Sequence, residues 1–556
     1  MAKREEFDVC VVGTGAGGGV MIQQLTAAGF KVVALQRGPF LQGSDFDDDE
    51  LATAVRDQVF SPNQRETYRF DEASPTVRGR FNATADCVGG TMTHWGGRSW
   101  RLRPEELQVL SHEGPVEGAS LADWPISYEE LEPFYEQAEV DFGVAGEAGT
   151  NPFEAPRKTA YPNPAHPDRA SALYFADGAK KLGLHPFRVP LAINPALYGG
   201  RGPCRYAGAC AGFGCPVHAK ATTLSVSIPR ALATGNLDLR PNSTALEVTV
   251  GPEGQAKSVR YLDWKRNLRE VFARHFVVSG NAVGSAHLLL LSKSGSFPGG
   301  LANSSGLVGK NLTFHLRPMV GCLVDGPARG FTGVETHAAV DDFHASDPRR
   351  GFIRGGVVVE TNDFSRQPIA YAVFGSAGFP GMRRRWGKDL KDFLRSFPSA
   401  VFLSAVLEDL PMEENRVDLS PDEKDEDGVP VPRITHRQHA NDVAMHRWFE
   451  QRLADIAEAT GARVRWLARI AGVTYVDEKI AMMGSTDLLG TCRMGKDPAR
   501  SVLDPWCRTH DVKNLWVVDG SCFPTAGGYN PTLTILANAY RVADYFVREA
   551  KRQALR

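Results

Sequence analysis

Three glycines near the N-terminus have a spacing that could hold the phosphates of a dinucleotide. Gly13, Gly15 and Gly18 follow an apolar run at 7–12 and precede a segment with helical character. In this pattern the first glycine permits a tight turn, the second lets the backbone approach a pyrophosphate, and the third lets helix and strand pack closely. The amides and positive dipole end of the helix would then bind the phosphates. A second strand over 31–35 completes a βαβ unit, so the sequence predicts a dinucleotide site.

Length, composition and charge limit the class of protein. The chain has 556 residues, is 42% hydrophobic and carries a formal net charge of −2. The length predicts more than one domain or one large two-part fold. The charge offers no basic surface for nucleic acid, and no apolar run is long enough to span a membrane. Because no apolar signal segment precedes the first strand, we expect a cytoplasmic protein, with export on a signal-bearing partner left open.

The remaining pattern predicts a second, separate sheet. Helices are expected over 128–142, 171–183, 438–460 and 532–553. Apolar, strand-like segments, which would form an antiparallel sheet, lie at 317–325, 352–361, 368–374 and 399–408. The charged stretch 418–433 contains prolines and is expected to be a connection, whereas 514–519 is expected to be a last parallel strand. Because both ends of the chain contribute to one sheet, we predict an α/β domain interrupted by an α+β domain.

Several motifs in a fixed order resemble the glucose–methanol–choline (GMC) family of FAD-dependent alcohol oxidoreductases. Besides the N-terminal glycines, they lie at 88–95, 280–285, 309–312, 490–495, 518–521 and 528–532. The match spans nearly the whole chain and is most similar to the sugar-acting branch: gluconate and related dehydrogenases, glycoside 3-dehydrogenases and pyranose oxidases. It implies an α/β fold in which a Rossmann-like FAD-binding domain is interrupted by an α+β substrate domain with an antiparallel sheet.

The resemblance also implies domain limits and a reaction. The FAD-binding domain is expected at 1–45, 80–110, 200–315 and 475–556, and the substrate domain at 46–79, 111–199 and 316–474. The expected reaction is oxidation of a secondary hydroxyl of a sugar, glycoside or sugar acid to a ketone, by hydride transfer to flavin N5. The expected partners are a carbohydrate substrate and a small subunit or electron-acceptor protein.

The resemblance assigns roles to individual residues. Gly89, Gly90 and Thr91 would form a tight turn beneath the flavin and pyrophosphate, and Asp519 and Gly520 would contact the pyrophosphate and ribityl chain. Each also fits an ordinary structural role, as a loop glycine or a strand end.

Two further roles concern the substrate and the flavin ring. Asn530, which opens the last helix, would bind the substrate hydroxyl, and Thr532 of the same motif would contact the cofactor. Asn530 also fits an ordinary helix N-cap. The segment 93–95 resembles the pyranose oxidase segment in which a histidine is bonded to the flavin, so His94 is a candidate for a covalent link, with a noncovalent contact as the alternative.

Two residues depart from the family pattern. Gln36 stands where the family has a glutamate that accepts hydrogen bonds from the adenosine ribose; its side-chain carbonyl can still accept them. Asp487 stands where the family has a histidine, so the expected catalytic pair becomes Asp487 and Asn530. An aspartate is a weaker base than histidine in water, although burial can raise its pKa.

Three interpretations of the base are open. Asp487 acts with a raised pKa; another histidine acts, with His315, His436 and His439 as candidates; or the chemistry is altered. If the chemistry is impaired or altered, the chain would be a flavin-dependent lyase, isomerase or natural-product tailoring enzyme, or an inactive flavin-binding subunit.

Three cysteines form a cluster in a glycine-rich stretch. Cys204, Cys210 and Cys215 resemble the cysteine-rich insert of multi-subunit sugar dehydrogenases, some of which hold a three-iron cluster there. Three thiolates suit an iron–sulfur cluster, and an odd number does not suit disulfides alone. Free or disulfide-bonded thiols and a zinc site are the alternatives.

Overall fold

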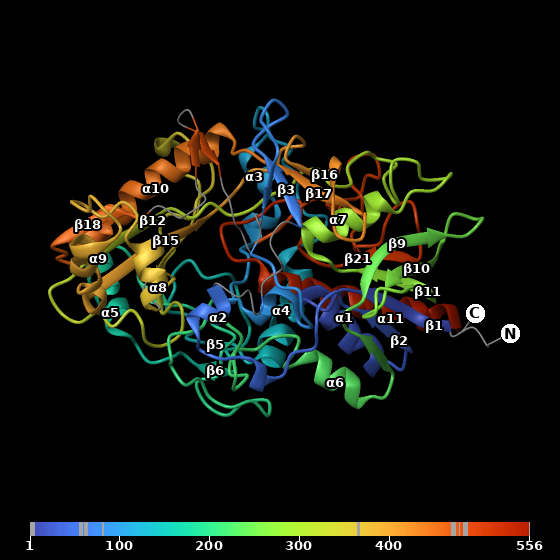
Figure 1. The fold of residues 1–556 in the computed structure, drawn as a ribbon, viewed down its shortest axis with the longest axis horizontal. Helices are drawn as coiled ribbons and strands as arrows, with labels where there is room; N and C mark the ends of the chain where they lie inside the picture. Colours follow the sequence, from blue (N-terminus) through green and yellow to red (C-terminus); the bar gives the residue numbers. More distant parts are fainter. Residues whose placement is uncertain are drawn as a thin grey trace.

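Two large sheets form opposite ends of an elongated molecule, with a smaller sheet between them (Figure 1). The computed structural model describes residues 6–54, 59, 65–79, 83–363, 367–468, 474–476, 479–481 and 487–554. One large sheet is mostly parallel and the other is antiparallel, which confirms the predicted fold class. None of the helices in the described part of the chain is long and apolar enough to cross a membrane.

The first sheet has a parallel core built from both ends of the chain. Its parallel strands are β1 (Glu6–Val12), β2 (Val32–Leu35), β8 (Leu237–Arg240), β11 (Leu268–Val278) and β21 (Leu515–Val517). The order is β8-β2-β1-β11, and the predicted late strand β21 pairs with β11. The antiparallel strands β10 (Ala256–Leu262) and β9 (Thr244–Val250) extend the sheet beyond β11. The four residues of β2 are all buried, as expected for a parallel strand covered on both faces.

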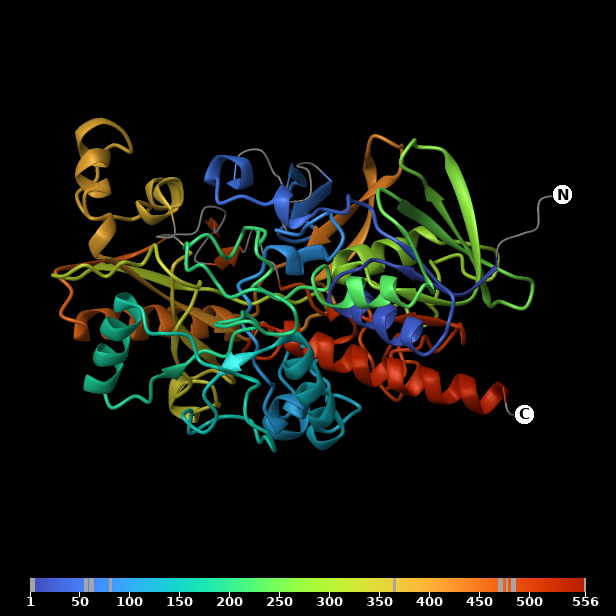
Figure 2. The same ribbon diagram turned by 90° about the horizontal axis from the view of Figure 1, so that it is seen from below.

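Helices cover this sheet and bring its two chain ends together. The helix α1 (Ala16–Ala27) packs against α6 (Ser227–Ala233) and against the C-terminal helix α11 (Thr532–Ala554). As a result β1 and the far end of α11 lie at the same end of the molecule (Figure 2). The helix α7 (Asn281–Leu291) follows β11 directly.

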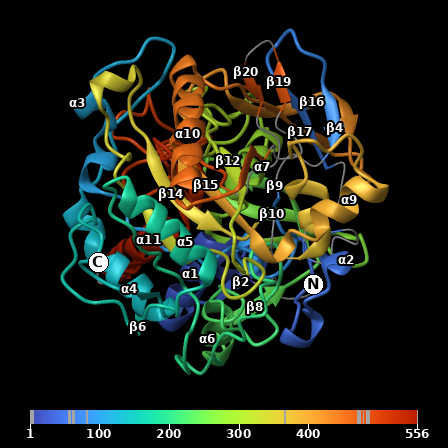
Figure 3. The same ribbon diagram turned by 90° about the vertical axis from the view of Figure 1, so that its left-hand side faces the viewer.

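The second sheet is covered on both faces. Its order is β18 (Val464–Leu467), β12 (Met319–Leu323), β15 (Ala400–Leu407), β14 (Gly356–Thr361), β13 (Ala338–Val340) and β7 (Phe187–Arg188). Along β12, Val320 and Cys322 face one hydrophobic cluster, whereas Met319 and Leu323 face another. The first cluster includes residues of α5 (Ala170–Lys181) and α10 (Ala440–Ala459), and the second includes residues of α9 (Gly387–Leu394). Figure 3 shows these three helices at this end of the molecule. This alternation is the period-2 pattern of a strand buried on both sides.

The segment 368–374 is helical, so its predicted strand is wrong. The helix α8 (Pro368–Ala370) continues into a helical turn at Tyr371–Gly375. Proline occupies the first helical position, and the carboxylate of Glu50, on α2 (Glu50–Ala54), accepts hydrogen bonds from the amides of Ile369 and Ala370. This cap comes from more than 300 residues away along the chain, so the local sequence contains no sign of it.

The segment 418–433 forms a hairpin, so its predicted irregular connection is also wrong. The strands β16 (Arg416–Lys424) and β17 (Pro430–Thr435) join β3 (Glu66–Arg69) and β4 (Val77–Gly79) in a four-stranded sheet. In the turn, Asp425 Oδ1 accepts hydrogen bonds from the amides of Asp427 and Val429. Gly428 has φ +77°, which favours glycine.

The strands of the two large sheets fall on different sides of the expected domain limits. Every strand of the first sheet lies within 1–45, 200–315 or 475–556, and every strand of the second lies within 111–199 or 316–474. The limit expected at residue 80 lies outside the described residues, so the exact division stays a proposal.

Two glycines of the N-terminal loop provide a matched test of this packing. A Cβ on Gly17 would lie 1.7 Å from the carbonyl oxygen of Val518, whereas a Cβ on Gly15 would meet nothing within 4 Å. We therefore expect Gly17→Ala to lower the free energy of unfolding by roughly 3 kcal/mol, and Gly15→Ala to leave it nearly unchanged. Chemical denaturation of the two variants measures this difference. Equal stabilities would contradict the close approach of α1 to Val518.

Candidate active site

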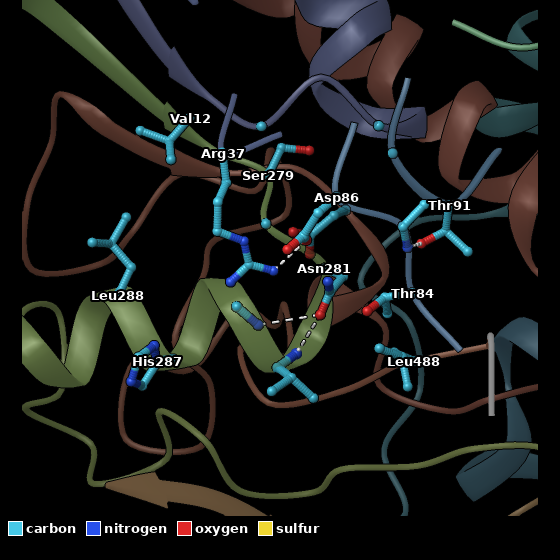
Figure 4. Close-up of a pocket in the computed structure, with 18 of the residues that line it drawn as sticks. Val12, Arg37, Thr84, Asp86, Thr91, Ser279, Asn281, His287, Leu288 and Leu488 are labelled. Atoms are coloured by element: carbon cyan, nitrogen blue, oxygen red, sulfur yellow. Dashed lines mark hydrogen bonds and ion pairs between the residues drawn. The ribbon is translucent and has the colours of Figure 1, made fainter. Parts of the chain in front are cut away.

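One cavity runs along the carboxyl ends of the parallel strands (Figure 4). Residues that follow β1, β2, β11 and β21 all line it, which is where ligands bind in open α/β sheets. The predicted site residues that line it are Gly13, Gly15, Gln36, Gly90, Thr91, Asp487, Asp519, Gly520 and Thr532. The predicted residues Gly18, Gly89, His94 and Asn530 are not part of its lining. The structure therefore brings residues from both ends and the middle of the chain to one site.

The three N-terminal glycines have the geometry that a dinucleotide loop requires. Gly13 has φ +97°, and a Cβ there would lie 2.2 Å from the carbonyl oxygen of Ser279. A Cβ on Gly18 would lie 2.1 Å from the carbonyl oxygen of Gly13. Gly15 caps α1 without a side-chain hydrogen bond, and the space where its Cβ would lie is open. The N-terminus of α1 is therefore accessible to an anionic group from the cavity.

The second glycine segment packs on the first. Gly89 and Gly90 have φ values of +96° and +57°, and the short helix Gly90–Thr93 follows. A Cβ on Gly90 would lie 3.0 Å from Gly15 Cα, so the two backbones are in direct contact. The amide of Gly89 donates to the hydroxyl of Thr14 at 3.1 Å. The tight turn expected at Gly89, Gly90 and Thr91 is thus present beside the N-terminal loop.

Gln36 does not offer a free carbonyl to a ribose, contrary to expectation. Its Oε1 accepts hydrogen bonds from Thr14, from the backbone amide at 3.1 Å and from the hydroxyl at 2.8 Å. The backbone amide can only donate, so it fixes which end of the Gln36 amide faces Thr14. The donor end of the Gln36 side chain, its NH₂ group, therefore faces away from Thr14.

Charged and polar side chains that the sequence analysis did not single out surround the Gln36 end of the cavity. Arg37 points toward Asp86, with which it forms an ion pair, and Asp86 also pairs with Arg65 at 3.3 Å (Figure 4). At the start of α7, the Asn281 side chain accepts hydrogen bonds from the amides of Val283 and Gly284, at 2.9 and 3.1 Å. No local motif marks Arg37, Asp86 or Arg65, which come together only in the fold.

Asp519 organises the turn after β21. Its Oδ2 accepts a hydrogen bond from Ser285 Oγ at 2.6 Å, and its Oδ1 accepts one from the amide of Ser521 at 2.8 Å. A Cβ on the next residue, Gly520, would lie 2.4 Å from the carbonyl oxygen of Leu488. The turn therefore links β21, α7 and the segment that carries Asp487.

Asp487 lies between His315 and Asn530 at the other end of the cavity. Its Oδ2 accepts hydrogen bonds from Asn530 Nδ2 at 3.0 Å and from His315 Nδ1 at 3.2 Å. The second nitrogen of His315, Nε2, donates to the carbonyl oxygen of Gly527 at 2.8 Å. The histidine is fully buried, so it cannot contact a ligand in the cavity, whereas Asp487 lines the cavity.

Hydrogen bonds and charges set the protonation of this pair. Burial would raise the pKa of Asp487, but the hydrogen bond and charge of His315, with Arg317 and Asn530, hold it below its usual range. Burial would lower the pKa of His315, but Asp487, Glu408 and the Gly527 carbonyl together raise it. The expected rise in the pKa of Asp487 is therefore not found, because His315, Arg317 and Asn530 together outweigh desolvation.

The other two candidate histidines have different roles. His436 is buried against the ring of Phe314 and lies 2.9 Å from Asp409. His439 accepts a hydrogen bond from the amide of Asn441 and thereby caps α10. None of the three candidate histidines lines the cavity, and His315 is the one that the fold brings to Asp487.

A tryptophan orients the amide of Asn530. Trp100 Nε1 donates to Asn530 Oδ1 at 3.3 Å, and its ring stacks on Tyr529 with centroids 5.4 Å apart. Asn530 does not line the cavity itself but is only partly buried. Because its oxygen faces Trp100 and one N–H faces Asp487, its second N–H is the remaining donor of the amide. The sequence analysis missed Trp100, which is 430 residues away along the chain.

The structure does not show a metal site at the three predicted cysteines. Within the described residues no group of three or more His, Cys, Asp or Glu side chains is placed to hold a metal ion, and Cys204, Cys210 and Cys215 are free. Instead, the buried ammonium of Lys220 donates to the carbonyl oxygens of Cys210 and Phe213, both at 2.7 Å. Burial raises the pKa of Cys210 to about 12, which favours the thiol over the thiolate that metal binding needs. The expected iron–sulfur cluster is not supported.

Comparisons with known proteins agree with this architecture. Models of the GMC oxidoreductase family match residues 123–317 and 411–539. The chain is 32% identical to 2-methyl-1,2-propanediol dehydrogenase of Mycolicibacterium austroafricanum, over 98% of this chain and 96% of that protein. It is 33% identical to paromamine 6'-oxidase of Streptomyces fradiae (97% and 90% covered) and 30% identical to gluconate 2-dehydrogenase flavoprotein of Pantoea cypripedii (96% and 92% covered).

Solved structures share the fold at lower identity. Pyridoxine 4-oxidase from Mesorbium loti superposes with a TM-score of 0.65 at 17% identity, over 97% of this chain and 99% of that one. Formate oxidase from Aspergillus oryzae RIB40 gives a TM-score of 0.65 at 13% identity, over the whole of both chains. With the sequence relatives, the glycine loops and the cavity at the ends of the parallel strands, these matches show that the chain belongs to the GMC oxidoreductase family and is an FAD-dependent oxidoreductase acting on CH–OH groups.

Proposed function

We propose that this protein oxidises a secondary hydroxyl of a sugar, glycoside or sugar acid to a ketone. The observation that supports this most is the group formed by Asp487, His315 and Asn530, which lies at one end of a cavity that begins at the dinucleotide-binding glycines. Removing a hydride from a carbinol carbon requires that the hydroxyl proton also be taken up. A carboxylate that lines the cavity and contacts a buried histidine is suited to that task.

The residues at the other end of the cavity fit FAD. Gly15 leaves space beside the N-terminus of α1 for the pyrophosphate, and Gly90 packs against it without a side chain. We infer that Gly13, Thr91, Asp519, Gly520 and Thr532 complete the contacts to the cofactor. FAD, when bound, supplies the acceptor for the hydride.

The Asp487–His315 pair takes the proton. His315 Nε2–H donates to Gly527, so Nδ1 is the nitrogen that gains and loses a proton beside Asp487. When Nδ1 is unprotonated, the pair carries one negative charge and Asp487 accepts the hydroxyl proton, with His315 Nδ1 as the neighbouring acceptor. Because the pKa of His315 is raised, the pair reaches this form at a higher pH than a free histidine, whose pKa is about 6.5.

Asn530 orients the hydroxyl. Its oxygen is held by Trp100 and one N–H by Asp487, so its second N–H donates to the substrate oxygen. The hydroxyl is then bound by a donor on one side and faces the Asp487 carboxylate on the other.

The names of the relatives support the proposed substrate class. They include a gluconate 2-dehydrogenase flavoprotein, a fructose dehydrogenase large subunit and a paromamine 6'-oxidase. A small diol is the second candidate, because another relative is named as a 2-methyl-1,2-propanediol dehydrogenase.

Turnover with a panel of substrates tests the proposed function. We expect at least one sugar, glycoside or aldonate to reduce an artificial electron acceptor and to yield a ketone detected by NMR. If only small diols are oxidised, the substrate is a small diol and not a carbohydrate. A product formed without net reduction of the acceptor would instead indicate a lyase or isomerase, and no turnover at all would indicate an inactive subunit.

His94 bears on how the cofactor is held. His94 is 2% exposed and does not line the cavity. The next residue, Trp95, does line it. We therefore propose that FAD is bound without a covalent link. Acid precipitation should leave a yellow supernatant and a colourless pellet; a yellow pellet would establish the covalent link.

A further inference from the structure

The loop Ala526–Asn530 positions both His315 and Asn530. The carbonyl oxygen of Gly527 accepts the hydrogen bond from His315 Nε2, and Asn530 lies three residues further on. The loop is buried from Ala526 to Tyr529, and Gly527 adopts φ +73°, outside helix and strand geometry. Its buried amides therefore need acceptors from elsewhere in the fold.

Two buried carboxylates bind three consecutive amides of this loop. Glu408 Oε1 accepts hydrogen bonds from the amides of Ala526 at 3.1 Å and Gly527 at 2.9 Å. Glu106 Oε1 accepts one from the amide of Gly528 at 3.0 Å. Glu408 is 1% exposed and Glu106 is 0% exposed. A buried amide left without an acceptor costs about 1–3 kcal/mol, so these carboxylates strongly favour one loop position.

Of the two carboxylates that bind the loop, Glu408 is the one that acts on His315. It binds the N–H of Gly527, whose carbonyl binds His315. Its second oxygen, Oε2, makes no hydrogen bond to the described residues and lies 3.7 Å from Arg354 Nε. Burial raises the pKa of Glu408, while Arg354 and His315 oppose that rise. The groups that face His315 are therefore Asp487 and Glu408, with Arg317 beyond Asp487, and Glu106 and Arg354 beyond Glu408.

We propose that Glu408 is a positioning residue for the proton-accepting pair: by binding the amides of Ala526 and Gly527, it fixes the carbonyl that holds the Nε2 proton of His315, and so keeps Nδ1 toward Asp487. The effect of Glu408 on the reaction rests on the proposed function, in which the Asp487–His315 pair takes up the hydroxyl proton. The structural part of the inference, the tautomer of His315, does not depend on any substrate.

Substitutions at Glu408 separate positioning from simple stability. Glu408→Gln keeps an oxygen that can accept from the amides, Glu408→Leu removes it, and Glu408→Asp withdraws it by one methylene. Glu413→Gln is the matched control, because Glu413 is half exposed, lies five residues away and pairs with Lys310 outside the cavity. If Glu408→Leu does not fold, Glu408→Asp takes its place as the variant to compare with Glu408→Gln and the wild type.

The decisive measurement is ¹⁵N NMR of histidine-labelled holoprotein as a function of pH, with His315 assigned by the loss of its signals in His315→Gln. We expect the neutral form to be the Nε2–H tautomer alone in the wild type, Glu408→Gln and Glu413→Gln, and a mixture of tautomers in Glu408→Leu. Glu408→Leu should also slow reduction of the bound flavin about tenfold or more. A pure Nε2–H tautomer in Glu408→Leu would overturn the proposal, whatever its stability.

The two readouts distinguish the proposal from the function on which it rests. If no carbohydrate or diol is oxidised, the proposed function fails, while the tautomer of His315 still decides the role of Glu408. If the tautomer changes but the rate of flavin reduction does not, Glu408 positions His315 and the role of His315 in the reaction is wrong.

Discussion

One carboxylate oxygen, Asp487 Oδ2, accepts hydrogen bonds from both His315 and Asn530, and the active site depends on it. His315 precedes the β12 strand of the antiparallel sheet, whereas Asn530 opens the α11 helix that packs on the parallel sheet. The shared oxygen therefore joins the two halves of the molecule at the end of the cavity. It also explains the protonation of the site: the histidine keeps the carboxylate ionised, and the carboxylate raises the pKa of the histidine.

The other end of the cavity depends on the absence of side chains. Gly13 and Gly17 let the start of α1 approach the ends of β11 and β21, and Gly18 lets it approach Gly13, so closely that any Cβ would overlap a carbonyl oxygen. Gly15 and Gly90 bring two loops into backbone contact while leaving room on the cavity side. A continuous cavity between these glycines and Asp487 follows from the parallel strands, which all end at the same edge.

Features encoded within short segments could be predicted from the sequence. The glycine spacing, the first βαβ unit and the late strand β21 all carry local signals, and the pairing of Asp487 with Asn530 followed from the family motif. Features created by distant residues could not be predicted in the same way. His315 lies 172 residues from Asp487, so the direction of the aspartate's pKa shift was missed. Likewise, Thr14 donates to the side-chain carbonyl of Gln36, and Lys220 donates to two carbonyl oxygens of the cysteine-rich loop.

The most direct test of the account is the pH dependence of anaerobic flavin reduction by an active substrate, in the wild type and in Asp487→Asn. The account predicts that the wild-type rate rises as His315 loses its proton, with a midpoint above pH 6.5 because Asp487 stabilises the charged imidazole. Asp487→Asn removes both the proton acceptor and that stabilisation, so it should slow reduction about 10²-fold or more and remove this dependence. An unchanged rate and pH profile in Asp487→Asn would contradict the account.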